Sequence, residues 1–222
     1  MVARITNISA WIPLIGVVLG VLAFTGSQAP ATILVPGGPA VSTPGTATLA
    51  GLTLKASDTI PFIGTDVFGD NVFGGNLISS VYSDPGTGGL DFTYQIDAAT
   101  GYPDTIHAAT VDYYVGFSTD VDYVKNSGNA GTYATAALSS NGGYISLDYL
   151  ASAGDGIAPG ETSDIVMVKT DATQYDEFGD TALIDGGGVT VNSFEPVPEP
   201  MSLGLLAVGG VICAARRSRR RI

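Results

Sequence analysis

Short stretches in which apolar and polar residues alternate recur along the middle of the chain. Apolar residues occupy every second position from Leu90 to Ile96, and the same period recurs from Ile145 to Tyr149. A period of two puts successive side chains on opposite faces of a strand, so each stretch predicts a strand with one buried face. The uninterrupted apolar run from Ile165 to Val168 instead predicts a central strand.

Turn-forming residues separate these stretches. The chain holds 30 glycines and 12 prolines. Frequent turn residues of this kind favour strands joined by turns over helices. Weaker strand candidates are residues 47–54, 71–82, 106–117, 133–138 and 189–194. About eight short strands predict an all-β domain, an antiparallel β-sandwich for which a jelly-roll-like topology is one arrangement. We assign it to residues 49–195, after a Pro/Gly-rich extended leader at 30–48.

A regular β-helix is the alternative all-β architecture. It would need a short motif that returns at a fixed period. The Thr-x-Thr of Thr46-Ala47-Thr48 does not recur in register. This weakens both the β-helix and a regular ice-binding ladder.

Arg4 and an uncharged apolar run from Trp11 to Phe24 mark the amino end of the chain. A basic start, an apolar centre and the small residues Ser27 and Ala29 are typical of a secretory signal peptide. We predict that residues 1–29 form this signal, with cleavage after Ala29. A retained amino-terminal anchor is the alternative. Both would deliver the body of the chain across a membrane.

A second apolar segment, Met201 to Ala215, lies near the carboxyl end. As a helix it would rise only about 22 Å, less than the roughly 30 Å hydrocarbon core, and long arginine side chains can bridge the difference. The arginines that follow are Arg216, Arg217, Arg219, Arg220 and Arg221. The positive-inside rule keeps this arginine cluster in the cytoplasm and places the acidic body on the other side of the membrane.

The residues Val197, Pro198, Glu199 and Pro200 stand directly before this segment. With the Gly/Leu/Ala-rich run and the terminal arginines, they resemble the PEP-CTERM sorting signal. Met201 departs from the usual Ser or Thr of that family, and Ile222 follows the arginines. Proline biases its predecessor toward extended backbone, so residues 195–200 are expected to form an exposed, non-helical strip that a protease can grip.

This resemblance covers about 26 of 222 residues. It implies where the protein is delivered and does not imply an activity. Proteins with such a tail are exported by bacteria with exopolysaccharide-producing envelopes, and an exosortase-type membrane protease is expected to cut near the Pro-Glu-Pro. Tails of this kind also occur on some ice-binding proteins. The implied partners are the exosortase, the membrane and exopolysaccharide. A plain stop-transfer anchor with a stiff Pro-Glu-Pro spacer is the alternative.

Charge and composition exclude several classes of protein. Residues 30–196 hold 20 acidic residues against three lysines, whereas sequence-independent nucleic-acid binding needs clustered basic residues. His107 and Cys213 are the only histidine and cysteine, which excludes His- or Cys-rich zinc sites, iron–sulfur clusters and a disulfide framework. Trp11, the only tryptophan, would leave with the signal, so sugar stacking would depend on Tyr or Phe.

Enzymatic chemistry has little support in the sequence. A Ser-His-Asp triad would have to use His107, and no Gly-x-Ser-x-Gly elbow supplies its nucleophile. A glycosidase needs two nearby carboxylates, which leave no sequence signature, and among 20 acidic residues such neighbours are expected by chance. We therefore predict that the body is not an enzyme.

Calcium is the one cofactor for which the sequence offers ligands. Asp171, Asp176, Glu177 and Asp180 supply hard oxygen atoms on a predicted loop, and calcium takes six to eight of these. Smaller acidic groups lie at 120–122 and 155–156, and none matches an EF-hand. The alternative is a solvated acidic face that keeps an exported protein soluble.

These observations predict an exported structural protein of the cell surface or extracellular matrix. Before processing it would be anchored in the inner membrane with its body outside the cytoplasm. The body is alternatively an exopolysaccharide-binding module that uses tyrosines or calcium loops. A polysaccharide hydrolase is the less favoured alternative.

Overall fold

Twelve β-strands make up the fold in the computed structural model, which describes residues 32–43, 45–128, 134–150 and 156–198. The strands are β1 (Thr32–Ile33), β2 (Val41–Ser42), β3 (Thr53–Thr65), β4 (Asn71–Ser83), β5 (Leu90–Ala98), β6 (Ala108–Asp112), β7 (Thr119–Val124), β8 (Thr135–Leu138), β9 (Tyr144–Asp148), β10 (Ile165–Thr170), β11 (Tyr175–Asp185) and β12 (Gly187–Pro196). The predicted signal peptide with Ala29, the residues Glu199 and Pro200, the apolar segment 201–215 and the arginine cluster lie outside the described residues.

All strands belong to one antiparallel sheet with the order β1-β7-β10-β5-β4-β3-β12-β11-β6-β9-β8-β2. The two outermost strands, β1 and β2, are only a few residues apart in the chain. Between them, the Leu34 N–H donates to Thr119 O at the β7 end of the sheet, and the Gly37 N–H donates to Leu138 O at the β8 end. The segment predicted as a leader thus bridges the two edges and nearly closes the sheet.

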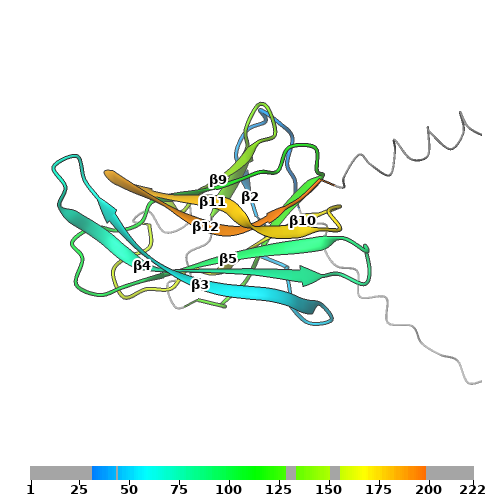
Figure 1. Ribbon diagram of the computed structural model, residues 1–222, viewed down its shortest axis with the longest axis horizontal. Helices are drawn as coiled ribbons and strands as arrows, with labels where there is room; N and C mark the ends of the chain where they lie inside the picture. The colour runs from blue at the N-terminus through cyan, green and yellow to red at the C-terminus, as the bar shows by residue number, and fades with distance from the viewer. Residues whose placement is uncertain (1–31, 44, 129–133, 151–155, 199–222) are drawn as a thin grey trace, which may run out of the picture.

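The sheet has two halves that face each other: one runs from β1 to β3 in the strand order, and the other from β12 to β2. The adjoining strands β3 and β12 pair at a single position, Gly188 opposite Thr65. Beyond it β12 leaves β3, and in Figure 1 β11 and β12 cross above β3, β4 and β5 as a second layer. Pro61 lies in the part of β3 that β12 leaves unpaired. Proline has no N–H to donate to a ladder, so its presence is compatible with an edge strand.

Apolar side chains from both halves fill the space between them. Phe62 packs edge-on against Phe73, with ring centroids 6.2 Å apart, and Phe92 packs in the same way against Tyr114 at 6.1 Å. Fully buried members of this core include Leu77, Ile96, Ile106, Ile145, Leu147 and Ile157. Burial of this apolar surface is the main term that favours folding.

The all-β, antiparallel prediction is confirmed, and several strands lie where the pattern places them. The strand expected at 71–82 is β4, and the apolar run from Ile165 is β10, which lies between β5 and β7. The predicted strand at 47–54 is wrong, because β3 begins only at Thr53 and runs to Thr65. Residues 119–124 and 175–185, predicted to contain acidic loops, are the strands β7 and β11.

The prediction that β5 has one solvent-exposed face is also wrong. Asp91 and Thr93 point away from the core, yet they are only 1% and 4% exposed. The segment 45–52 covers this outer face, since its backbone N–H groups at Gly45 and Thr46 bond to Asp122 on β7, and residues 48 and 50–52 line a pocket together with Asp91. Alternation alone does not reveal such a covering segment.

Candidate functional site

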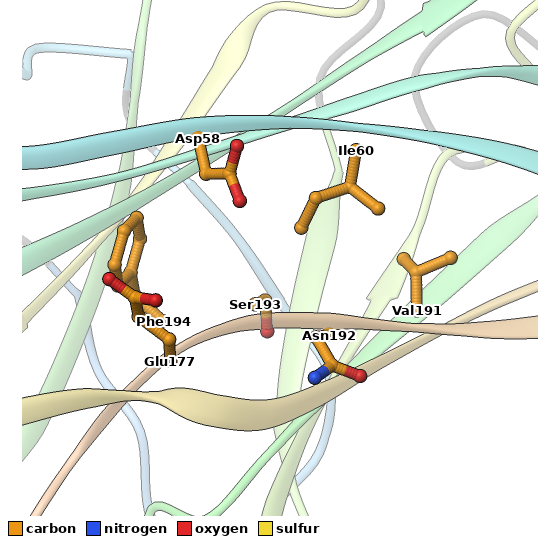
Figure 2. Close-up of a pocket in the computed structure, with 7 residues that line it drawn as sticks. All are labelled: Asp58, Ile60, Glu177, Val191, Asn192, Ser193 and Phe194. Carbon is orange, nitrogen blue, oxygen red and sulfur yellow. The ribbon is translucent and has the colours of Figure 1, made fainter.

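A cleft of about 390 Å³ opens where β3 and β12 separate. Its lining comes from three strands: Asp58 and Ile60 from β3, Glu177 from β11, and Val191, Asn192, Ser193 and Phe194 from β12. Figure 2 shows the β3 side chains pointing across the cleft toward β12. The cleft is thus built between the two halves of the sheet, at the place where they stop pairing.

The cleft has an acidic end and an apolar end. In Figure 2 the carboxylates of Asp58 and Glu177 lie at one end, while Ile60 and Val191 approach each other at the other. Asp58 and Ile60 are two positions apart on one strand and therefore share a face. The amide of Asn192 adds both donors and acceptors.

Two local features of the backbone shape this cleft. The pairing of β11 with β12 shifts between Asp176 and Gly179, which marks a β-bulge, and a bulge redirects side chains. At this bulge Glu177 lines the cleft, while Phe178 is 76% exposed. Next to the bulge, Ser193 Oγ on β12 accepts a hydrogen bond from Thr181 Oγ1 on β11 at 2.9 Å, which holds the Ser193 side chain in place.

The chemistry of the cleft suits hydrogen bonding to hydroxyl groups. Exposed carboxylates accept such bonds, and the amide can both donate and accept. The carboxylates and the amide that line the cleft can therefore hydrogen-bond a hydroxyl-rich ligand.

Glu195 is the centre of a second acidic group beside the end of β12. Its side chain is buried, and its pKa is raised to about 7 by burial first, then by a hydrogen bond to Asp176 and by the charges of Asp176, Asp180 and Asp112. Its Oε2 atom has no hydrogen-bond partner among the described residues. Sequence reasoning missed Glu195 in this role, because the strand pairing that places it opposite Asp176 is long-range.

The four predicted calcium ligands do not come together. Asp171 accepts a hydrogen bond from the Ser118 N–H at 2.9 Å, and Glu177 lines the cleft. Only Asp176 and Asp180 lie close enough to Glu195 to raise its pKa. Within the described part of the chain, no group of three or more His, Cys, Asp or Glu residues has the arrangement of a metal site.

The start of the predicted sorting motif lies at the end of β12. The Val197 N–H donates to Gln174 O at 3.0 Å, Val197 is half-buried and Pro198 is exposed. The expectation of an exposed strip from residue 195 onward is wrong for Glu195 and Pro196, which are buried in β12. Their pairing with β11 explains this, since Asp176 and Tyr175 lie opposite them. In the described ranges, no helix has the length and apolar character to cross a membrane.

The tyrosines divide into core and surface residues, as the sequence suggested. Tyr94, Tyr114 and Tyr149 are fully buried, whereas Tyr113 and Tyr144 are about half exposed. None of them lines the β3–β12 cleft. His107 contacts Asp185, with 2.8 Å between Nδ1 and Oδ1.

No family model, no curated protein and no solved structure matches this chain.

Proposed function

We propose that this protein is exported and sorted to the cell surface or extracellular matrix by its PEP-CTERM-like tail. One observation carries the proposal: a Val-Pro-Glu-Pro motif, a short apolar segment and an arginine cluster follow one another in residues 197–222. In this proposal a signal peptide precedes a sandwich-like body, and a short membrane helix holds it until an exosortase cuts. The exposed Pro198, two residues after the end of β12, supports access for such a protease.

Processing in a host that contains an exosortase tests this proposal. We expect Glu199→Ala, or removal of the arginine cluster, to leave the full-length chain in the inner membrane, because the protease signal or the topology signal is lost. Glu177→Ala, a glutamate change in the folded body, is the matched control and should be processed normally. Unchanged size and location of both tail variants, measured by immunoblot of cell fractions, would contradict the sorting proposal.

A second candidate function, glycan binding by the body, is favoured by the β3–β12 cleft. Asp58, Glu177 and Asn192 supply hydrogen-bonding groups, while Ile60 and Val191 offer an apolar surface to the C–H face of a sugar ring. Sites of this kind, mostly apolar with a few well-placed polar groups, are common for small ligands. In this function the body would hold exopolysaccharide through the cleft rather than through tyrosines.

Calorimetric titration of the full-length protein in detergent with exopolysaccharide from a producing strain tests the second function. Because a hydrogen bond to a charged group contributes about 1.5–3 kcal/mol, Asp58→Asn or Glu177→Gln should weaken binding roughly 10- to 100-fold. Asp66→Asn, in the turn after β3, is the control and should bind normally. Equal affinity of all these variants, or no binding by the unmodified protein, would exclude the cleft as the glycan-binding site.

A further inference from the structure

Thr105, His107 and Asp185 form a continuous chain of side-chain contacts on the surface of the domain. The Thr105 Oγ1 and His107 Nε2 atoms lie 2.7 Å apart, and His107 Nδ1 lies 2.8 Å from Asp185 Oδ1. Each ring nitrogen therefore has a different partner. With the carboxylate accepting from Nδ1–H, the Nε2 atom is left to accept the hydroxyl proton of Thr105.

The fold holds these three residues in place. Ile106, between the other two positions, is fully buried, and its N–H and C=O both pair with Ile157. Thr105 and His107 consequently share the outward face of this extended segment. The His107 N–H donates to Ile184 O at 3.2 Å, which brings the segment beside Asp185 at the end of β11.

Gly156 lies beside the imidazole. It has a φ of +77°, and a β-carbon built on it would lie 2.9 Å from His107 Cδ2. A residue with a side chain at this position would therefore collide with the ring that the Thr105 and Asp185 contacts hold.

The chain of contacts is accessible to solvent at the end where a reaction would start. The His107 side chain is 39% exposed and Thr105 is half-buried, whereas the Asp185 side chain is only 11% exposed. A partly exposed hydroxyl, an imidazole and a buried carboxylate, in this order of contacts, is the arrangement that activates a nucleophile.

We propose that Thr105 is the nucleophile of an acyl-transfer site, with His107 as its general base and Asp185 as the residue that positions the imidazole. Thr105 Oγ1 attacks the carbonyl carbon of an ester while His107 Nε2 takes the hydroxyl proton. The imidazolium then gives this proton to the departing alcohol, which leaves an acyl ester on Thr105. Water, deprotonated by His107 Nε2, then attacks the carbonyl carbon of that ester. The bond to Thr105 Oγ1 breaks, the imidazolium returns its proton to Oγ1, and the carboxylic acid is released. This activity is independent of the sorting and glycan-binding functions proposed above.

The surroundings indicate the class of substrate. The pKa of Asp185 is raised by burial first, lowered by His107 and raised again by the charge of Asp104, which adds negative charge beside the triad. The body is also strongly acidic. An anionic substrate would be repelled. An uncharged acyl group such as acetyl, carried on an uncharged alcohol, fits this charge.

Acylation of the full-length protein by p-nitrophenyl acetate tests the proposal. We expect a burst of one p-nitrophenolate per chain and one acetyl group on Thr105, located by peptide mass spectrometry. Thr105→Val should abolish the burst, and Thr105→Ser should retain it. His107→Gln should slow acylation about 10²- to 10⁴-fold, the usual contribution of a general base. Thr110→Val, on the neighbouring strand β6, is the matched control and should react normally.

The positioning role of Asp185 is tested by a measurement that a purely structural role would leave unchanged. Asp185→Asn should slow acylation while the melting transition stays cooperative, and Asp185→Glu should restore part of the rate. The absence of a burst from the unmodified protein would overturn the proposal. So would equal acetylation of the unmodified and Thr105→Val proteins at Lys55, Lys125 or Lys169, since that is the non-specific reaction of exposed amines.

Discussion

The hydroxyl of Tyr94 on β5 donates a hydrogen bond to the carbonyl oxygen of Phe194 on β12, at 2.9 Å and across the core. The Phe194 N–H is bonded in turn to Ser79 Oγ of β4 at 3.2 Å. Side chains of one half of the sheet thus satisfy backbone groups of β12 at the point where it has no β3 partner. A buried backbone group without a partner is costly, so these two hydroxyls allow β12 to leave β3 and open the cleft.

Replacing Tyr94 by phenylalanine should therefore destabilise the fold. The change removes the bond to Phe194 O and the 2.8 Å contact between the hydroxyls of Tyr94 and Tyr114. Leaving buried partners unsatisfied costs about 1–3 kcal/mol, which urea unfolding would measure. Tyr82→Phe, a half-buried tyrosine on the outer face, is the control. A free energy of unfolding equal to that of the unmodified protein would show that water or a shifted backbone replaces these bonds.

The stability of the body should fall as the pH rises from about 4 to about 8. Burial, and then the charge of Asp84, raises the pKa of Asp91 to about 7, while Lys169 lowers it. The folded state therefore retains a proton that the unfolded state releases near pH 4. The stabilisation is fully present below the unfolded pKa and is lost as the pH passes through 7.

Asp91→Asn tests this pH dependence, because an amide cannot release the proton. The melting temperature of this variant should change less between about pH 4 and pH 8 than that of the unmodified chain. Asp58→Asn, in an exposed part of β3, is the control. An equal pH dependence in all three proteins would assign the effect to other groups, of which Glu195 is the first to examine.

The sequence predicted the parts of the fold that depend on local patterns. Glycine-bounded alternation located β4, β5 and β9, because each has an apolar face that packs against the core. It missed β3, most of whose residues are exposed, and the start of β11, where a bulge at Asp176 to Gly179 interrupts the alternation. The alternation pattern also did not reveal that segment 45–52 covers Asp91, because this depends on the contact of residues 45 and 46 with Asp122.

The candidate sites were less accessible from the sequence than the fold. Asp58 and Glu177 are far apart in the chain, and only the divergence of β3 from β12 brings them to one cleft. The spacing Thr-x-His at 105–107 was visible, but its carboxylate comes from residue 185 on another strand. Acidic residues close in sequence also have different surroundings: Asp171 accepts a hydrogen bond from the Ser118 N–H, whereas Glu177 lines the cleft.

Calcium binding stays a prediction, and a melting experiment on the full-length protein decides it. Calcium that binds the folded state alone stabilises it by about 2.7 kcal/mol at a hundredfold excess over the dissociation constant. Asp176→Asn with Asp180→Asn should remove this calcium-dependent gain, since both residues face Glu195. Asp171→Asn should keep it, because Asp171 bonds to the Ser118 N–H instead. A melting temperature that changes with neither calcium nor chelator would favour the alternative to a calcium site, a solvated acidic face.

Gly64 on β3 offers a sharp test of the packing between β3 and β4. It lies opposite Phe73, and a β-carbon there would overlap the Phe73 ring, which is itself 1% exposed and packed against Phe62. Overpacking of this kind costs about 1–3 kcal/mol, so Gly64→Ala should lower the free energy of unfolding by that amount. In a Phe73→Leu background the same change should cost less, because the smaller side chain leaves room. Gly188→Ala, where the new carbon meets only ordinary contacts, is the matched control. A cost for Gly64→Ala that is the same in both backgrounds would show that the two residues are not coupled.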